Sequence, residues 1–149
     1  MGRAAAHEPL TADAAERWSK FGRGDVQLYV NLVGLEVEEV RTDYCRMRLP
    51  FRPELNQAAG SVHGGAIATL LDSVVVPAVG SAYPRDARFS TIDMHVQFLS
   101  ALMADDAIAE GWVVKRGKTT VFCEAEARAA SSGTVIARSL LTYHVSVPR

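Results

Sequence analysis

The chain has 149 residues, of which 48% are hydrophobic and 22% are charged, values typical of one globular domain and not of a disordered or fibrous protein. Its 16 lysines and arginines and 17 aspartates and glutamates give a net charge of −1. A chain so evenly balanced has no overall charge that attracts nucleic acid or an anionic membrane, so we expect neither as a partner.

Residues 1–25 are expected to form a helical lead-in, followed by a single domain over 26–149. The start of the lead-in contains no apolar segment of the kind that a secretory signal requires. The longest apolar stretch, 66–79, is too short and too polar to span a bilayer. We therefore expect a cytoplasmic protein. Within the lead-in, Thr11 is a suitable N-cap for a helix over 11–21.

A first pair of strands is predicted after the lead-in. Alternation over 44–49 places Cys45, Met47 and Leu49 on one face of a strand. The segment 26–40 ends in a similar alternation, so the two segments are expected to pair. The prolines that follow residue 49 end the second strand.

A long helix is predicted next, beginning after Gly65. Its apolar residues recur at the spacing of one helix face; they are Ile67, Leu70, Leu71, Val74, Val75 and Ala78. Pro77 interrupts this stripe, so we expect the helix to end near Val76 or to kink there.

The rest of the chain alternates with a period of two, which predicts four strands. Residues typical of tight turns separate strands at 104–106, 116–118 and 131–133, and strands joined in this way are antiparallel neighbours. One long helix laid against an antiparallel sheet defines the α+β class. The second face of this sheet carries the apolar Phe122 and Leu140 among polar residues, which predicts that another subunit covers part of it.

The candidate chemistry gathers at the start of the long helix, where Asn56 and His63 precede Gly64 and Gly65. Consecutive glycines at a helix start leave backbone N–H groups accessible, and the helix dipole adds partial positive charge there. This combination can polarise a carbonyl group, as acyl transfer requires. Asp72 lies about 120° from the centre of the apolar stripe. It therefore points toward solvent or a partner, where a carboxylate can act as a base or a nucleophile.

Each of these residues also has an ordinary structural interpretation. A histidine before a helix is often an N-cap, an asparagine in this position is typical of a turn, and glycines permit close packing. A helical aspartate is commonly just solvated. No metal site is expected, because Cys45 and Cys123 lack ligand spacing. His63 and Asp72 would lie roughly 180° apart around one helix.

The string from Asn56 to Asp72 reads Asn-x3-Gly-x2-His-Gly-Gly-x4-Leu-x-Asp. It resembles the signature of the hotdog-fold acyl-CoA thioesterases of the phenylacetate-pathway type, which include 4-hydroxybenzoyl-CoA and fatty acyl-CoA thioesterases. The segments 91–100 and 115–119 resemble the following parts of that family. The resemblance, which covers about 30–147, implies a long central helix wrapped by a curved antiparallel sheet, with an extra N-terminal helix outside it. It also implies a homodimer joined edge to edge, often paired into a tetramer, with active sites at the dimer interface.

The resemblance further implies a role for each residue. Asp72 would activate the hydrolytic water or attack the thioester, and Thr91 would help to place the water. The Gly64 N–H would hold the thioester oxygen with help from Asn56, while His63 would lie near the sulfur. Candidates for binding the substrate and its CoA phosphates are Gly65, Lys115, Arg116, Lys118 and Arg138. No cofactor is expected, because helix-start donors and one carboxylate suffice for hydrolysis.

Two alternatives on the same fold stay open. A non-catalytic acyl-CoA-binding sensor would usually lack the helix carboxylate or carry a DNA-binding extension, whereas Asp72 is present here and the lead-in is short. A hotdog dehydratase would carry a Pro-Gly-bearing helix start, which this chain lacks. The acyl group, aryl or fatty, and the choice between dimer and tetramer are left open by the sequence.

Overall fold

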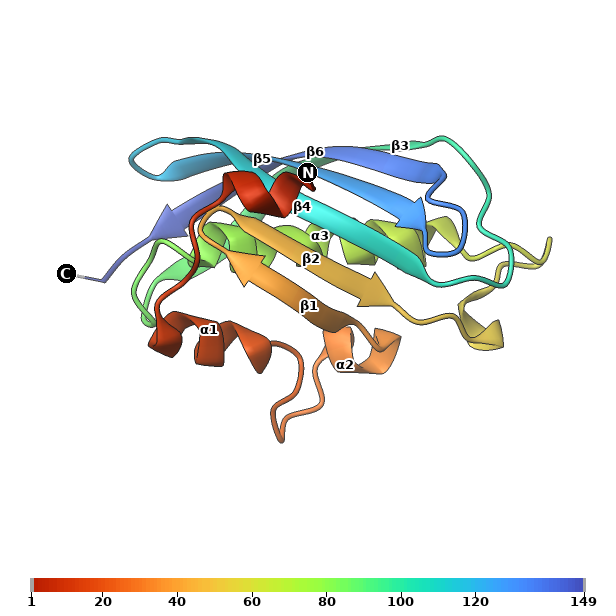
Figure 1. The fold of residues 1–149 in the computed structure, drawn as a ribbon, viewed down its shortest axis with the longest axis horizontal. Coiled ribbons are helices and arrows are strands. Elements are labelled where there is room, and N and C mark those ends of the chain that lie inside the picture. Colours follow the sequence, from red (N-terminus) through yellow and green to blue (C-terminus); the bar gives the residue numbers. More distant parts are fainter. Residues whose placement is uncertain (1, 149) are drawn as a thin grey trace.

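The computed structural model describes residues 2–148. Its strands are β1 (Glu36–Arg41), β2 (Tyr44–Leu49), β3 (Arg88–Phe98), β4 (Ala107–Arg116), β5 (Thr120–Ala129) and β6 (Val135–Ser146). Its helices are α1 (Ala12–Ser19), α2 (Tyr29–Val33) and α3 (Gly64–Gly80), with 3-10 turns η1 (Arg3–Ala6) and η2 (Pro53–Leu55). The strands form one antiparallel sheet in the order β1-β2-β4-β5-β6-β3. α3 lies along one face of this curved sheet (Figure 1), which confirms the predicted α+β hotdog architecture.

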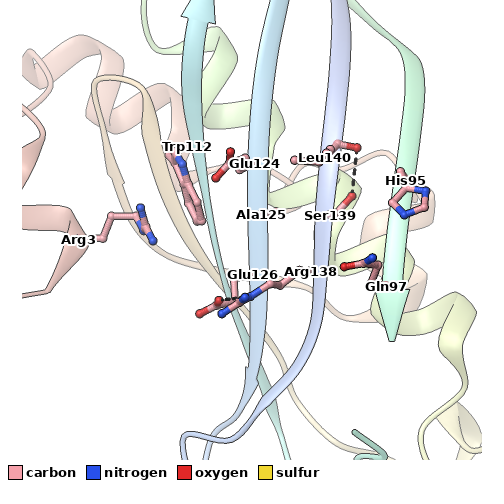
Figure 2. Close-up of a pocket in the computed structure, with 10 residues that line it drawn as sticks. All are labelled: Arg3, His95, Gln97, Trp112, Glu124, Ala125, Glu126, Arg138, Ser139 and Leu140. Carbon is pink, nitrogen blue, oxygen red and sulfur yellow. Dashed lines mark hydrogen bonds and ion pairs between the residues drawn. The ribbon is translucent and has the colours of Figure 1, made fainter. Parts of the chain in front are cut away.

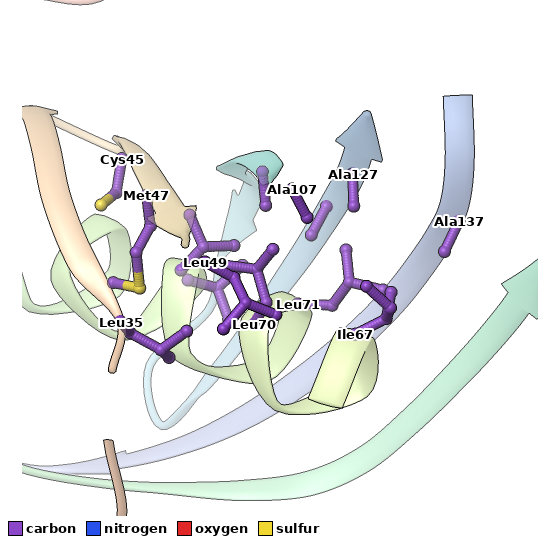
Figure 3. Close-up of a cluster of buried hydrophobic side chains, with 14 of the residues drawn as sticks. Leu35, Cys45, Met47, Leu49, Ile67, Leu70, Leu71, Ala107, Ala127 and Ala137 are labelled. Atoms are coloured by element: carbon purple, nitrogen blue, oxygen red, sulfur yellow. The ribbon is translucent and has the colours of Figure 1, made fainter. Parts of the chain in front are cut away.

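The core lies between α3 and the inner face of the sheet. All six residues of the predicted helix stripe are buried, as are Cys45, Met47 and Leu49 of β2 (Figure 3). Gly111 of β4 permits the close approach, because a Cβ atom there would lie 2.8 Å from side-chain atoms of Val74. The periodicity of the sequence therefore identified both sides of the core correctly.

The helix α3 does not end near Val76 but continues to Gly80. Pro77 lies in the last turn, is buried, and its carbonyl accepts the N–H of Ser81. The carbonyls of Ala78 and Val79, left free at the helix end, accept hydrogen bonds of 3.2 and 3.0 Å from the Arg116 guanidinium. A proline so close to the C-terminus removes one interior hydrogen bond, and the helix end has other partners that stabilise it.

The placement of β3 differs from the prediction. β3 does not pair with β4, the next strand in the chain, but lies at the far edge beside β6. The connection 99–106 therefore links two strands that β6 and β5 separate. Near its start, the Leu99 and Ser100 N–H groups donate to the Ile136 carbonyl. Turn residues mark where a chain reverses, but they do not determine which strands pair with one another.

An irregularity in β3 changes which side chains face the core. The register with β6 shifts between Thr91 and Asp93, so that Phe89, before the shift, and Met94, after it, both pack against the core. Strict alternation places these two side chains on opposite faces. Thr91 lies two residues after Phe89 on the same face of β3, where it contacts Asp72.

The N-terminal region packs beside the edge strand β1 and reaches both faces of the sheet. α1 begins as predicted, with Thr11 accepting a hydrogen bond from the Ala14 N–H, and its buried Trp18 occupies the space where Gly80 has no side chain. The turn η1, which precedes α1, lies on the outer face of the sheet, and the guanidinium carbon of Arg3 lies 3.5 Å from the centre of the Trp112 ring. Phe122 and Leu140 on that face remain 45% and 58% exposed. The domain boundary after residue 25 stays a prediction.

None of the helices found between residues 2 and 148 combines the length and the apolar character needed to cross a bilayer.

The short helix α2 was not predicted, because it lies in the segment 26–40 that shows no clear period. Four apolar side chains in and just before α2 are exposed: Val26, Leu28, Tyr29 and Leu32.

Candidate active site

Asp72 lies halfway along α3, on a face that the chain leaves partly uncovered. Its Oδ1 atom accepts hydrogen bonds from Thr91 Oγ1 at 2.9 Å and from the Tyr143 hydroxyl at 2.8 Å. The same hydroxyl lies 3.0 Å from the Asp72 backbone carbonyl. Among residues 2–148 no group donates to Asp72 Oδ2. The carboxylate is therefore oriented through one oxygen, while the other oxygen is left for chemistry.

Thr91 and Tyr143 reach the same oxygen because they are direct partners in the β3–β6 register. Tyr143 is buried, and its burial together with the nearby Asp72 carboxylate raises the pKa of its hydroxyl well above the usual value. The tyrosine therefore remains a proton donor toward Asp72 throughout the physiological range.

Tyr143 is a functional candidate that the sequence analysis missed. The alternation of β6 already places it on the buried face, and a buried tyrosine hydroxyl needs a hydrogen-bond partner. Which partner it finds depends on the pairing of β6 with β3, and the sequence did not reveal that pairing.

The start of α3 is organised by His63, which is its N-cap. The His63 Nδ1 atom accepts a hydrogen bond of 2.8 Å from the Gly65 N–H, so in the neutral ring the proton lies on Nε2. A Cβ atom at residue 65 would lie 2.9 Å from that Nδ1 atom, so glycine is what allows this cap. The Gly64 N–H has no acceptor within the described part of the chain and is exposed to a ligand approaching along the helix axis.

Asn56 lies beside this helix start. An isolated bridge pairs Asn56 with Val62, and the His63 N–H donates to the Leu55 carbonyl at 2.8 Å. The Asn56 Oδ1 atom is buried and has no hydrogen-bond partner among residues 2–148. The structure thus brings together Asn56, His63 and Gly64 at one place, and Asp72 and Thr91 at another.

These two groups are well separated along α3. Gly64 and Asp72 are eight residues apart on α3, which corresponds to about 12 Å along the axis at 1.5 Å per residue. A carbonyl oxygen bound to an N–H and a nucleophile in contact with the carbonyl carbon span only about 7 Å.

The four basic candidates lie elsewhere. Arg116 forms an ion pair with Asp43 and binds the C-terminal carbonyls of α3, at the helix end opposite to Gly64. Arg138 lies on the outer face, where its Nε donates to Glu126 at 2.7 Å (Figure 2). Lys115 and Lys118 are exposed near the β4–β5 turn, and no ion pair involving them is found among the residues that the structure describes.

Two cavities are lined by candidate residues. One, of about 330 Å³, lies at the start of α3 and is lined in part by Gly64, Ile67 and Phe98. The other, of about 450 Å³, lies on the outer face and includes Trp112 and Arg138 (Figure 2). The outer cavity is separated by the sheet from α3 and so from Asp72.

Comparisons with known proteins identify the family. The model of the thioesterase superfamily matches residues 59–136. Acyl-coenzyme A thioesterase 13 of Homo sapiens is 30% identical over 102 residues, which make up 68% of this chain and 71% of that protein. A Halobacterium salinarum protein with a provisional esterase name is 35% identical over 100 residues, 64% of this chain and 66% of its own length. The E. coli PaaI protein from the phenylacetic acid degradation operon shares the fold, with a TM-score of 0.73 and 18% identity over 79% of this chain and 83% of that chain.

The chain therefore belongs to the thioesterase superfamily. It is a thioester hydrolase, and the predicted membership of the hotdog thioesterases is confirmed.

Proposed function

We propose that this protein hydrolyses acyl-CoA thioesters to the free acid and CoA, with Asp72 as general base or nucleophile. The observation that carries the proposal is the Asp72 carboxylate, which Thr91 and Tyr143 hold through one oxygen while the other oxygen stays free. CoA enters the proposal through the relative named acyl-coenzyme A thioesterase 13. The predicted cytoplasmic location is part of the same proposal.

The active site is completed by a second copy of the chain. The separation of Gly64 and Asp72 along α3 supports a site in which the carbonyl-binding N–H and the carboxylate come from different subunits. Two features favour this arrangement. β3 is an edge strand with an unpaired side, and the adjacent face of α3, with Gly65 and Asp72, is incompletely covered. A homodimer that covers both features contains two equivalent sites, and a tetramer would be a pair of such dimers.

Catalysis begins when the thioester oxygen accepts a hydrogen bond from the Gly64 N–H, with Asn56 beside it. Asp72 of the partner subunit then either removes a proton from an attacking water or attacks the carbonyl carbon itself. If water attacks, its oxygen bonds to the carbonyl carbon, the carbon–sulfur bond breaks, and the free acid and the thiolate leave. If Asp72 attacks, the carbon–sulfur bond breaks to give the thiolate and an acyl anhydride on Asp72, and a water then hydrolyses this anhydride to the free acid and restores the carboxylate. The His63 Nε2–H, fixed in this tautomer by the N-cap, can donate a hydrogen bond to the departing sulfur.

Basic side chains without an ion-pair partner among the described residues are the candidates for binding the CoA phosphates. Arg116 and Arg138 are already paired with Asp43 and Glu126, so Lys115 and Lys118 are the better candidates. Their turn lies beside the end of β6, because the Val145 N–H, two residues beyond Tyr143, donates to the Thr119 carbonyl at 2.8 Å. The proposed chemistry uses only groups of the protein and requires no cofactor.

Release of free thiol from a panel of acyl-CoAs tests this proposal. The panel contains short, medium and long fatty acyl groups and an arylacetyl group. Turnover of at least one substrate is expected. Tight binding of acyl-CoA without thiol release would instead support the non-catalytic sensor and would contradict the proposal.

A further inference from the structure

We infer that Phe98 determines which acyl groups the enzyme accepts, and that the cavity at the start of α3 holds the end of the acyl group. This inference rests on the proposed function, because it concerns the substrate of the same site. It follows from three observations: the position of the Phe98 ring, the composition of the cavity wall, and the cavity's size.

The Phe98 ring lies directly against the start of α3. Three of its atoms would be 3.2–3.7 Å from a Cβ atom built on Gly64, so the ring covers the helix beside the free N–H. Phe98 is the last residue of β3 and is 56% exposed, so its side chain is not held by core packing. An acyl group whose carbonyl oxygen is bound by the Gly64 N–H must therefore pass this ring.

The wall of the cavity suits an apolar occupant. Its apolar side chains are those of Val62, Ile67, Phe98, Leu99, Ala101, Leu102 and Ile136. Two of its polar residues already satisfy each other, since Gln57 Nε2 donates to Ser61 Oγ at 2.8 Å. A hydrocarbon chain or an aryl ring contacts these apolar side chains without needing a hydrogen-bond partner.

The size of the cavity limits the acyl group. A volume of about 330 Å³ lies at the lower end of the roughly 300–1,000 Å³ that ligand pockets occupy. Medium-length acyl chains or a single aryl ring fit such a space beside Phe98, which forms part of its wall. Replacing Phe98 by a smaller side chain lengthens the space, and a larger side chain shortens it.

The test compares kcat/KM across the acyl-CoA panel for wild type, Phe98→Ala and Phe98→Trp. Phe122→Ala is the matched control, because it removes another exposed phenylalanine on the outer face of the sheet. Phe98→Ala is expected to raise the ratio of kcat/KM for a long chain to that for a short chain by about tenfold or more, the effect of one or two methylene groups in a pocket. Phe98→Trp is expected to lower this ratio, and the control is expected to leave it unchanged.

Inhibition by free CoA separates the two possible occupants of the cavity. If the acyl group fills it, the inhibition constant of CoA stays the same in all variants. An equal change for CoA and for every acyl-CoA would overturn the inference, because the cavity would then hold the pantetheine arm. An unchanged ratio in an active Phe98→Ala enzyme would also overturn it. A wild type that releases no thiol from any acyl-CoA would overturn the proposed function and the inference with it.

Discussion

Asp72→Asn is expected to lower kcat by about three orders of magnitude, within the range of about 10²–10⁴ that a general base contributes. The amide that replaces the carboxylate is neutral, so it can neither accept a proton from water nor attack a carbonyl carbon. Its carbonyl oxygen can still accept the hydrogen bonds that Thr91 and Tyr143 donate to Asp72 Oδ1. The fold and the melting temperature should therefore change little, and steady-state thiol release measures the chemical effect alone.

Asp93→Asn is the matched control for this substitution. Asp93 lies on the same strand as Thr91, and its carboxylate is exposed. Asp93 belongs to the edge strand that the proposed dimer covers, and its substitution removes the same charge without touching Asp72. We expect kcat of a variant that remains dimeric to stay within about twofold of wild type. Retention of most of the activity by Asp72→Asn would show that another group is the base or nucleophile.

Gly64→Pro is expected to lower kcat about 10²–10³-fold, the usual cost of removing one oxyanion donor. Gly64 is the first residue of α3, where proline is well tolerated because its missing N–H has no acceptor in the helix. The preceding His63 has φ −62° and ψ 134°, which is the extended conformation that a residue before proline prefers. The substitution therefore removes the proposed oxyanion donor without breaking the helix.

Gly64→Ala controls for the added side chain. Its Cβ atom meets the Phe98 ring at 3.2 Å, as the proline Cβ does, but it retains the N–H. The exposed ring can shift by the few tenths of an ångström required. We expect the alanine variant to keep kcat within about tenfold of wild type, since only packing is changed. Equal losses in the alanine and proline variants would show that the contact with Phe98, and not the N–H, matters at this position.

The sequence predicted the parts of this molecule that depend on local periodicity. The apolar stripe of α3 and the alternation of β2 are determined by side-chain spacing along a single element, and both were confirmed. The same spacing placed Asp72 away from the stripe, and in the structure its carboxylate is incompletely covered. The glycines at residues 64 and 65 likewise marked the start of the helix.

The parts that were missed depend on contacts between distant segments. The hydrogen bond from Tyr143 to Asp72 exists because β3 and β6 are neighbours, and no local pattern specifies that pairing. A bulge in β3 lets Phe89 and Thr91, before it, share a face with Met94, after it, and strict alternation gives no sign of that shift. The role of Arg116 as a partner of Asp43 and of the α3 carbonyls also required the folded chain, since in the sequence it is only one of several basic residues near a turn.

If each active site combines Gly64 of one subunit with Asp72 of another, a mixed dimer regains the activity that both parent variants lack. Asp72→Asn and Gly64→Pro chains are produced together with different affinity tags, and the dimer that contains one chain of each is isolated. Each parent homodimer should be nearly inactive. The mixed dimer contains one intact site of two and should release thiol at about half the wild-type rate per dimer. A mixed dimer as inactive as its parents would contradict the shared site, because a site built within one chain cannot be restored by mixing.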